Sequence, residues 1–561
     1  MLGQAAVRGM GGVLFKALWA VGLVSLFAAI LALQAYQAEQ AKASANANAA
    51  PMGTNPFGYL GMASYGDTTY CDPNSPSDGY PEDYGAYGSN GCQLEENYVN
   101  LLSEAQALIQ PIPGRADNKA LADLGYNLVQ LDNGWQGPRV SGVVTPNPER
   151  YCIPPPLTNH DCDTTGGTTS DFTSLIQTIK GMSGPVTGYH LEVGIYSDEG
   201  SGIGCGTSVP YETDNGLLGH ETQDAATYDG WGITYIKIDA LCSGLEANDV
   251  PAIHQAFSVH PNIRTDIYWS RDPLTGSSAI WRLGGDECGC INLHTETTNP
   301  RTSSTFEQLA DADGIPPADA IGYNNWDDLD NLLVHGVGGY GQVNGTLNNP
   351  WLSQSEQRTQ FGVEALTSSP LLIGSDVRVV VGGTYSTMVG DYAHGGRVTS
   401  VTYPADTDAL SILANEDVIW VDQDNRIEVA PKVAGDSTYD VRSKILTNFG
   451  QTGTRAVGLL NRTDLSGTSC TSAACISFSF STLRRDDGSS GGLTNVQHVY
   501  YLWSFSPGSG SKDLVNSTGT VTLAGSIVSY SCNSSGCTFG NSTHPIPPHG
   551  LILLKVQGIS T

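Results

Sequence analysis

Seven aspartates stand at or just beyond the carboxyl ends of short apolar segments that read as β-strands: Asp132, Asp198, Asp239, Asp286, Asp328, Asp330 and Asp376. In a barrel of parallel strands, active sites are built at this face. Cleavage of a glycosidic bond needs two carboxyl groups, because one must attack carbon as the anion and the other must protonate the leaving oxygen. When the anomeric configuration is retained, the two groups stand about 5–5.5 Å apart, and their coupled charges raise the pKa of the acid. The series can supply both groups.

A structural explanation competes with this hypothesis. A single aspartate at a strand end more often caps a helix, starts a turn or pairs with arginine. A series in register is harder to explain in that way. Nearby aromatic side chains could stack on sugar rings, although each alone would more often be packing: Tyr65, Trp135, Tyr196, Trp269 and Trp326.

The elements that must position the aspartates alternate between strand-like and helix-like segments. The predicted strands are Phe57–Tyr65, Asn127–Asp132, Leu191–Asp198, Thr234–Asp239, Thr265–Trp269, Ile280–Gly284, Ala320–Trp326 and Pro370–Ser375. Apolar residues at three- and four-residue spacing predict helices over Glu95–Gln110, Asp117–Leu124, Asp171–Gly181, Glu221–Gly230 and Ser353–Thr367. Eight strands alternating with helices indicate an α/β fold, a closed (β/α)8 TIM barrel, which we place at residues 51–425.

The chain changes character after about Asn425. Short β-prone runs, among them Ala456–Leu460, Val499–Phe505 and Leu551–Val556, are separated by turns of Gly, Ser, Thr and Asn. This pattern predicts a C-terminal antiparallel β-sandwich domain over residues 426–561.

Composition excludes some partners. The 26 Lys and Arg against 56 Asp and Glu give a formal charge of -30, which would repel nucleic acid and anionic lipid heads. A glycine pattern at Gly336–Gly341 matches a dinucleotide fingerprint but leads into a polar, Pro-containing segment, so we predict no cofactor. Cys288, Cys290 and His294 form one compact group without a second ligand pair, so we also predict no metal. The expected partner is a carbohydrate, and the oligomeric state stays open.

The first fifty residues indicate translocation. Arg8 and Lys16 precede an uncharged apolar run, Ala17–Leu33, and an Ala-rich linker follows. We favour a signal peptide, with a signal anchor as the alternative, so we expect a secreted or extracellular protein or one anchored in a membrane and facing the lumen or exterior.

Cysteine and asparagine patterns fit that compartment. Short-range pairs predict disulfides within Cys152/Cys162, Cys470/Cys475 and Cys532/Cys537. Asn-x-Ser/Thr sequons predict surface loops and a glycoprotein at Asn344, Asn461, Asn516, Asn533 and Asn541.

Several segments in order resemble glycoside hydrolase family 27, the α-galactosidase (melibiase) family of retaining enzymes. They include Leu131-Asp-Asn-Gly-Trp135, Gly194-Ile-Tyr196, Tyr235-Ile-Lys-Ile-Asp239, Trp281-Arg-Leu-Gly-Gly-Asp286 and Pro370-Leu-Leu-Ile-Gly-Ser-Asp376. The resemblance runs over nearly all of Phe57 to Val556. It implies that Asp239 is the nucleophile and Asp286 the general acid/base. It also implies a set of residues that contact the sugar: Asp132, Asn133, Lys237, Arg282, Tyr196 and Tyr65.

The sequence departs from the family pattern around the sugar. Asn133 replaces an acid, Tyr65 stands where the first strand carries a Trp, and Arg271 lies where an acidic contact is usual. Because Gly134 replaces a cysteine, Cys92 needs another partner, for which Cys71 is the candidate. Cys205 with Cys242 still resembles the family's bridge beside the nucleophile.

Three functions remain open at this point. The first is a retaining enzyme that removes terminal α-linked galactose from oligo- or polysaccharides. The second keeps fold and mechanism but takes another glycon, a β-L-arabinopyranoside, an α-N-acetylgalactosaminide or an isomalto-type glucan; Asn133 and Arg271 motivate it. The third is a non-catalytic carbohydrate-binding protein.

Overall fold

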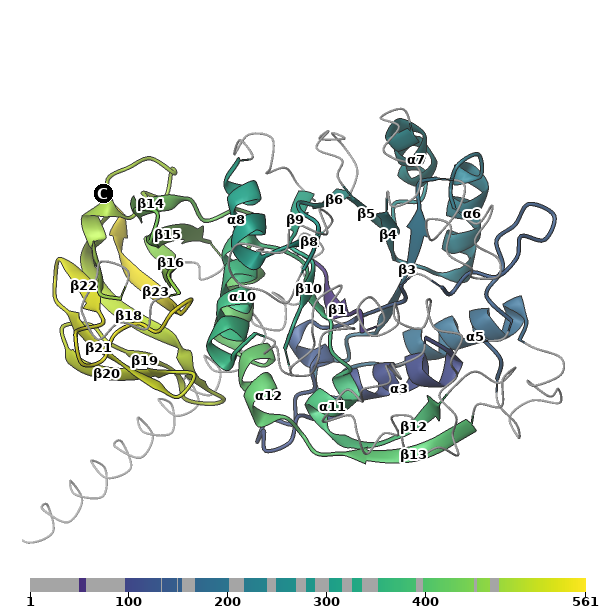
Figure 1. The fold of residues 1–561 in the computed structure, drawn as a ribbon, viewed down its shortest axis with the longest axis horizontal. Coiled ribbons are helices and arrows are strands. Elements are labelled where there is room, and N and C mark those ends of the chain that lie inside the picture. Colours follow the sequence, from purple (N-terminus) through teal and green to yellow (C-terminus); the bar gives the residue numbers. More distant parts are fainter. Residues whose placement is uncertain are drawn as a thin grey trace, which may run out of the picture.

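The computed structural model (Figure 1) describes residues 50–56, 96–132, 134–148, 150–153, 167–200, 216–239, 249–268, 279–287, 302–314, 325–334, 352–389, 397–447, 452–464 and 474–560. The predicted targeting segment lies outside these residues except for Ala50. No helix in the described part of the chain is long and apolar enough to cross a membrane.

A closed parallel sheet forms the first part of the molecule. Its order is β10-β11-β1-β2-β3-β4-β5-β6-β9, and every neighbouring pair is parallel. The two ends, β9 and β10, are consecutive in the chain, separated only by Leu329 and Asp330. They therefore form one interrupted strand that closes the sheet into a ring of eight positions, as the sequence predicts for a (β/α)8 barrel. The strands are β1 (Met52–Thr54), β2 (Leu128–Gln130), β3 (Glu192–Asp198), β4 (Tyr235–Asp239), β5 (Arg264–Tyr268), β6 (Ala279–Arg282), β9 (Asn325–Asp328), β10 (Asn331–Leu332) and β11 (Leu371–Ile373).

The first strand lies earlier in the chain than predicted. β1 occupies Met52–Thr54 between β11 and β2, whereas the predicted strand Phe57–Tyr65 lies outside the described residues. The short Met-Gly-Thr run before Pro56 carries almost no periodic signal, and its close approach to β2 depends on Gly53. A Cβ at Gly53 would stand 2.1 Å from the Leu128 carbonyl oxygen.

Helices cover the barrel, with α6, α7, α5 and α3 on one side and α8 and α10 toward the second domain (Figure 1). The longer ones begin at side chains that cap free backbone N–H groups: α5 starts with a Thr168/Asp171 capping box and α10 with a Ser353/Glu356 box. The described helices are α3 (Tyr98–Leu108), α5 (Thr169–Lys180), α6 (Glu221–Trp231), α7 (Asp249–Ser258), α8 (Thr305–Gly314), α10 (Gln354–Thr367), α11 (Val377–Val381), α12 (Thr407–Leu413) and α13 (Glu416–Asp422).

The predicted helix over Asp117–Leu124 is wrong. Only a single 3-10 turn, Ala122–Leu124, forms there, because Ala120 makes a β-bridge with Pro111 and Gly125 ends the turn with a φ of 112°. The Asp123 carboxylate accepts the Ala120 N–H at 2.8 Å and therefore caps the turn.

A two-stranded antiparallel ribbon, β12 (Gly383–Val389) with β13 (Arg397–Tyr403), lies beside α3 and α11 of the barrel (Figure 1). A six-stranded sheet has the order β14-β15-β16-β23-β18-β19 and a four-stranded sheet the order β17-β22-β21-β20, and all their pairs are antiparallel. A separate apolar core that includes Val457, Leu459, Val528 and Phe539 draws on both, as expected for a sandwich. The strands are β14 (Lys432–Gly435), β15 (Tyr439–Leu446), β16 (Thr454–Asn461), β17 (Ile476–Ser479), β18 (Leu493–Ser506), β19 (Gly510–Asp513), β20 (Thr518–Leu523), β21 (Ser526–Cys532), β22 (Gly536–Phe539) and β23 (Leu551–Ser560).

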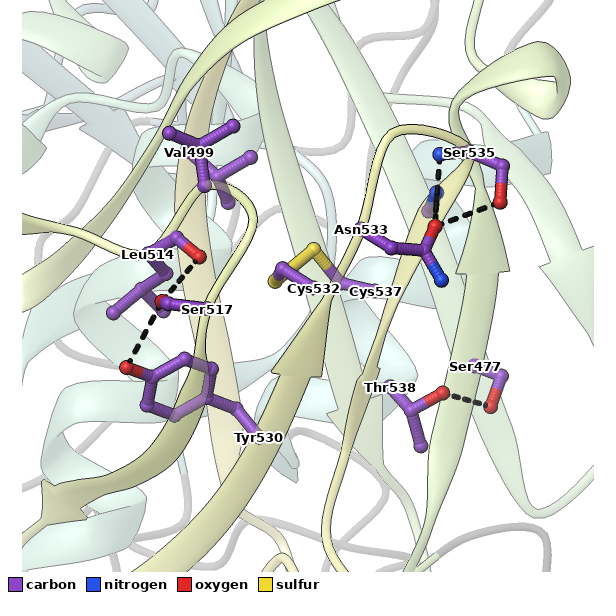
Figure 2. Close-up of a disulfide and its surroundings, with 12 residues drawn as sticks. Ser477, Val499, Leu514, Ser517, Tyr530, Cys532, Asn533, Ser535, Cys537 and Thr538 are labelled. Atoms are coloured by element: carbon purple, nitrogen blue, oxygen red, sulfur yellow. Dashed lines mark hydrogen bonds between the residues drawn. A yellow bond between two sulfur atoms is a disulfide. The ribbon is translucent and has the colours of Figure 1, made fainter.

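One predicted disulfide is seen in full. Cys532 and Cys537 are bonded across the β21–β22 hairpin, whose turn holds Asn533 (Figure 2). Cys152 and Cys475 are each disulfide-bonded as well. Their predicted partners Cys162 and Cys470, and the candidates Cys71, Cys92, Cys205 and Cys242, lie outside the described residues, so these pairings stay predictions.

The sequons differ in position. Asn516, Asn533 and Asn541 are exposed, as predicted for surface turns. Asn461 is wrong as a surface site: it is fully buried, and its Nδ2 donates to the carbonyls of Ile546 at 3.1 Å and Pro547 at 3.0 Å. The Asn461 sequon looks the same as the others in the sequence, because the residues that bury Asn461 lie about 85 positions away in the chain.

Candidate active site

The inner face of β4 carries the central residues of the site. Tyr235 belongs to a small apolar cluster inside the barrel together with Leu128, Ile280 and Trp326. Because side chains alternate along a strand, Lys237 and Asp239 lie on the same inner face, successively closer to the carboxyl end. Asp239 is 6% exposed, so it is buried without being fully enclosed.

The adjacent strands bring further polar groups to this level. In the β3–β4 register, Tyr196 is opposite Lys237 and Asp198 is opposite Asp239. The Lys237 Nζ lies 3.6 Å from the Asp132 Oδ2 and 5.7 Å from the centre of the Tyr196 ring. Four predicted residues, Asp132, Tyr196, Lys237 and Asp239, therefore converge at the carboxyl ends of β2, β3 and β4.

The electrostatics keep Lys237 charged and Tyr196 protonated. Burial lowers the pKa of the Lys237 ammonium, and the positive charge of Arg282 acts in the same direction. The carboxylates of Asp132, Asp330 and Asp239 outweigh both effects, so the pKa is raised and Lys237 stays charged. Burial, followed by the negative charge of Asp239, raises the pKa of the Tyr196 phenol well above its ordinary value. Tyr196 therefore remains a hydrogen-bond donor.

Arg282 is held by two aspartates at the end of the seventh strand position. Its Nη1 lies 3.7 Å from the Asp328 Oδ2, and its Nη2 donates to an Asp330 carboxylate oxygen. Asp330 adopts a left-handed φ of 76°, at the interruption between β9 and β10, and its N–H is accepted by Asp328 Oδ1 at 2.8 Å. The break in the strand thus turns the Asp330 carboxylate toward Arg282.

The backbone of Asp286 begins β7 (Asp286–Glu287), which pairs in parallel with β8 (Thr302–Ser303). The residue before it, Gly285, is fixed through its carbonyl, which accepts from Arg282 Nη2 and from Gln308 Nε2 of α8, both at 3.2 Å. The Asp286 side chain lies outside the description, so its distance from Asp239 and its role stay predictions.

Asp132 is held by two residues that the sequence patterns did not reveal. Asn55 Nδ2, directly after β1, donates to the Asp132 Oδ2 at 3.0 Å. Glu96, ahead of α3, accepts the Asp132 N–H on its Oε2 at 2.8 Å. Asn55 was not predicted because the first strand was expected after it, at Phe57–Tyr65, and not directly before it. No local signal distinguishes Glu96 from its acidic neighbour Glu95.

Other predictions about the site are wrong or untested. Trp135 is fully buried and stacks on Phe172 at 5.6 Å, and Trp326 lies inside the apolar barrel cluster, so neither ring is available to a sugar. Asp376 instead pairs with Arg378 at 2.7 Å beside α3. Several predicted positions lie outside the description of their side chains: Tyr65, Asn133, Trp269, Arg271, Cys288, Cys290 and His294. Within the described residues, no group of three or more His, Cys, Asp or Glu side chains could hold a metal ion.

This arrangement suits a neutral, hydroxyl-rich ligand. One carboxylate, Asp239, stands beside a charged ammonium, a second carboxylate and a phenolic donor, and together these groups can donate to and accept from hydroxyl groups. A buried carboxylate held among fixed hydrogen-bonding groups can act as a nucleophile or as a base.

Comparisons with known proteins find α-galactosidases among the similar sequences. No family model matches the chain. An α-galactosidase of Oryza sativa subsp. japonica is 26% identical over 66% of this chain and 69% of its own length. One of Cyamopsis tetragonoloba is 25% identical over 56% of this chain, which spans 63% of that relative and so less than two thirds of it.

Solved structures show the same fold. α-Galactosidase I from Mortierella vinacea superposes with a TM-score of 0.57 at 20% identity, covering 92% of this chain and 98% of that one. A family 27 β-L-arabinopyranosidase from Geobacillus stearothermophilus does so with a TM-score of 0.53 at 15% identity, over 92% and 98%.

Proposed function

We propose that this chain is a member of glycoside hydrolase family 27 and a retaining glycosidase that removes terminal α-linked galactose from oligo- or polysaccharides. The observation that carries the proposal is the convergence of Asp239, Lys237, Asp132 and Tyr196 on the inner face of the barrel. The names of the α-galactosidase relatives support the choice of galactose.

In the proposed mechanism, the ionised Asp239 carboxylate attacks the anomeric carbon, and the bond to the leaving oxygen breaks. Asp286 gives its proton to that oxygen, so the aglycon leaves as an alcohol and the sugar remains as an ester of Asp239. Asp286, now ionised, removes a proton from water, whose oxygen attacks the anomeric carbon and releases Asp239. Two inversions at one carbon retain its configuration.

The groups around Asp239 hold the glycon. Lys237 donates to sugar hydroxyls from an ammonium that Asp132 keeps charged, and Asp132 accepts from them. Arg282 completes the glycon site in our proposal, with Asp328 and Asp330 fixing its guanidinium. No metal or cofactor takes part in any of these steps.

The second candidate keeps the mechanism and changes the glycon. Asn133 stands where the family pattern has an acid, and an amide donates as well as accepts and carries no charge. β-L-Arabinopyranosides, α-N-acetylgalactosaminides and isomalto-type glucans are therefore alternative substrates.

We also propose that the chain works outside the cytosol, with a catalytic unit over residues 51–425 and a sandwich over 426–561. Three described cysteines in separate segments, Cys152, Cys475 and Cys532, are disulfide-bonded, and such bonds persist in oxidising compartments.

Hydrolysis of a panel of aryl glycosides tests the proposal. The panel compares the α-galactoside, β-L-arabinopyranoside and α-N-acetylgalactosaminide, with Asp239→Asn as the inactive control. Turnover of the α-galactoside that the substitution abolishes is the expected result. Preference for another glycon would support the second candidate, and no turnover of any panel member or of natural oligosaccharides would refute the enzyme.

A further inference from the structure

We propose that Glu96 is a positioning residue, which holds Asp132 in the orientation that the glycon requires without touching the sugar itself. This inference rests on the proposed function, because it gives Asp132 a role in sugar binding.

The end of β2 creates the need for Glu96. The sheet hydrogen bonds of this strand end where the Leu131 N–H donates to the Gly194 carbonyl at 2.9 Å. The next N–H, that of Asp132, is buried beyond the sheet and needs an acceptor, because an unpaired buried N–H is costly. Glu96 Oε2 supplies that acceptor at 2.8 Å, across 36 residues of chain.

Glu96 is itself fixed from its other side. Its Oε1 accepts the Tyr151 hydroxyl at 2.6 Å, and the whole residue is only 2% exposed. Both carboxyl oxygens therefore have partners within the protein, so the side chain has one orientation.

The Asp132 carboxylate points away from this support toward the site. Its Oδ2 accepts from Asn55 Nδ2 at 3.0 Å and lies 3.6 Å from Lys237 Nζ. Glu96 thus fixes the backbone of Asp132 while Asn55 and Lys237 fix its side chain. A shift of about 1 Å in a substrate-positioning group can cost about 100-fold in rate, so the backbone contact bears on catalysis.

The charge state of Glu96 fits this role. Burial raises its pKa to about 8, against the lowering effects of the Tyr151 hydroxyl and of Arg150, while the nearby Asp132 charge raises it further. Below that pH Glu96 is mainly neutral and does not repel Asp132. Its proton then lies on the oxygen that faces Tyr151, whose hydroxyl can accept as well as donate, and Oε2 stays an acceptor for the Asp132 N–H. Glu96→Gln keeps this pattern, with an NH2 toward Tyr151 and an oxygen toward Asp132, so it should preserve the support.

The test compares Glu96→Ala, Glu96→Gln and Tyr151→Phe with the wild-type chain. We expect Glu96→Ala to lower kcat/KM about 10–100-fold, Tyr151→Phe to change it in the same direction by less, and Glu96→Gln to stay within about threefold below pH 7. Above pH 8 the wild type should lose activity that Glu96→Gln retains. If Glu96→Ala does not fold, Tyr151→Phe and the pH profile of Glu96→Gln decide.

Asp123→Ala is the matched control. Asp123 is also buried and also accepts backbone N–H groups, from Ala120 at 2.8 Å and Thr187 at 2.7 Å, but it lies before β2 at the opposite end of the strand. We expect it to lower the melting temperature without changing KM or the pH profile. Equal kinetic effects of Asp123→Ala and Glu96→Ala would overturn the proposal.

Hydrogen exchange of the peptide that contains Asp132 separates this proposal from the proposed function. We expect Glu96→Ala to speed exchange there whether or not the chain hydrolyses a glycoside. If the wild type shows no turnover while exchange is faster in Glu96→Ala than in the wild type, the proposed function is refuted and the positioning role of Glu96 is kept. An active wild type whose variants match it in kinetics and exchange would overturn the role of Glu96.

Discussion

At the scale of single residues, the site depends on one ammonium among several carboxylates. Lys237 lies within reach of Asp132 and above the Tyr196 ring, and the carboxylates keep its pKa raised despite burial. Removing that charge would leave Asp132 buried at 2% exposure without its cation.

We therefore expect Lys237→Met to lower kcat/KM by about 10–100-fold, because a hydrogen bond from a charged group contributes about 1.5–3 kcal/mol. Steady-state kinetics on the preferred aryl glycoside measures this. Lys180→Met is the control, since among the described residues Lys180 Nζ donates only to the Gly232 carbonyl, at 2.6 Å, away from the site. Equal kcat/KM values for Lys237→Met and the wild type would show that Lys237 does not contribute to glycon binding.

The predictability of these residues follows from the range of their contacts. Lys237 and Asp239 lie on a five-residue strand in which polar residues alternate with isoleucines, and this alternation predicts that both face the same side. Glu96 and Asn55 act across 36 and 77 residues, and a single sequence does not show which distant partner a polar side chain will meet. The Asp330–Arg282 pair depends on the left-handed backbone of Asp330 between β9 and β10, and no periodicity in the sequence indicates such a break in a strand.

At the scale of elements, strands were predictable where an apolar run marks them, as in β3 and β4 and in the three-residue β2 and β11. β1 was misplaced because Met52–Thr54 has no such run. Helices show the same contrast, because α10 has both an apolar face and a capping box, whereas the Asp117–Leu124 segment is ended by Gly125 after one turn.

Two helical glycines show how packing decides the effect of one substitution. A Cβ at Gly362 of α10 would stand 2.4 Å from Leu551 Cδ2 and 3.2 Å from Trp503 Cζ2, whereas a Cβ at Gly230 of α6 would meet nothing within 4 Å. We expect Gly230→Ala to stabilise by about 0.5–1 kcal/mol through helix propensity. Gly362→Ala should destabilise by about 1–3 kcal/mol, because its overpacking outweighs the same gain.

Urea unfolding of both glycine variants checks these signs against the wild type. Stabilisation by Gly362→Ala would mean that α10 and β23 are not packed as closely as the structure has them.

At the scale of the whole molecule, some residues of the sandwich belong to the hydrophobic core of the barrel. Residues of β16, β18 and β23 join the barrel's cluster through Leu460, Leu502 and Leu551. Beside this contact, His549 of the sandwich lies between two acids: its Nδ1 is 2.8 Å from Glu356 of α10, and its Nε2 is 2.8 Å from Asp464. The Phe306 ring of α8 lies edge-on at 5.9 Å.

This contact should make stability depend on pH. Burial lowers the pKa of His549, but the hydrogen bonds and charges of Glu356 and Asp464 outweigh burial and raise it. A raised histidine pKa contributes stability that is present below the unfolded value of about 6.5 and is lost as pH rises through the folded value. Glu356, whose pKa is lowered by His549 against the effect of burial, loses its contribution at acidic pH instead.

We expect His549→Gln to lower the melting temperature more at pH 6 than at pH 8.5. The control is His190→Gln, because His190 is exposed and, within the part of the chain that the structure describes, its ring bonds only to the Lys180 carbonyl, at 3.1 Å. If His549→Gln lowers the melting temperature by the same amount at both pH values, the charge of His549 does not link the two domains.

The central claim is that Asp239 forms a covalent bond to galactose, and trapping that ester tests it most directly. The Asp239 carboxylate should attack the anomeric carbon of a 5-fluoro-α-galactosyl fluoride, release the anomeric fluoride into solvent and leave a glycosyl ester that hydrolyses slowly. Mass spectrometry of a peptic digest is predicted to find the added sugar on the peptide containing Tyr235–Asp239, and to find none in Asp239→Asn. An ester on another carboxylate, or no ester in a chain that turns over the galactoside, would contradict the account.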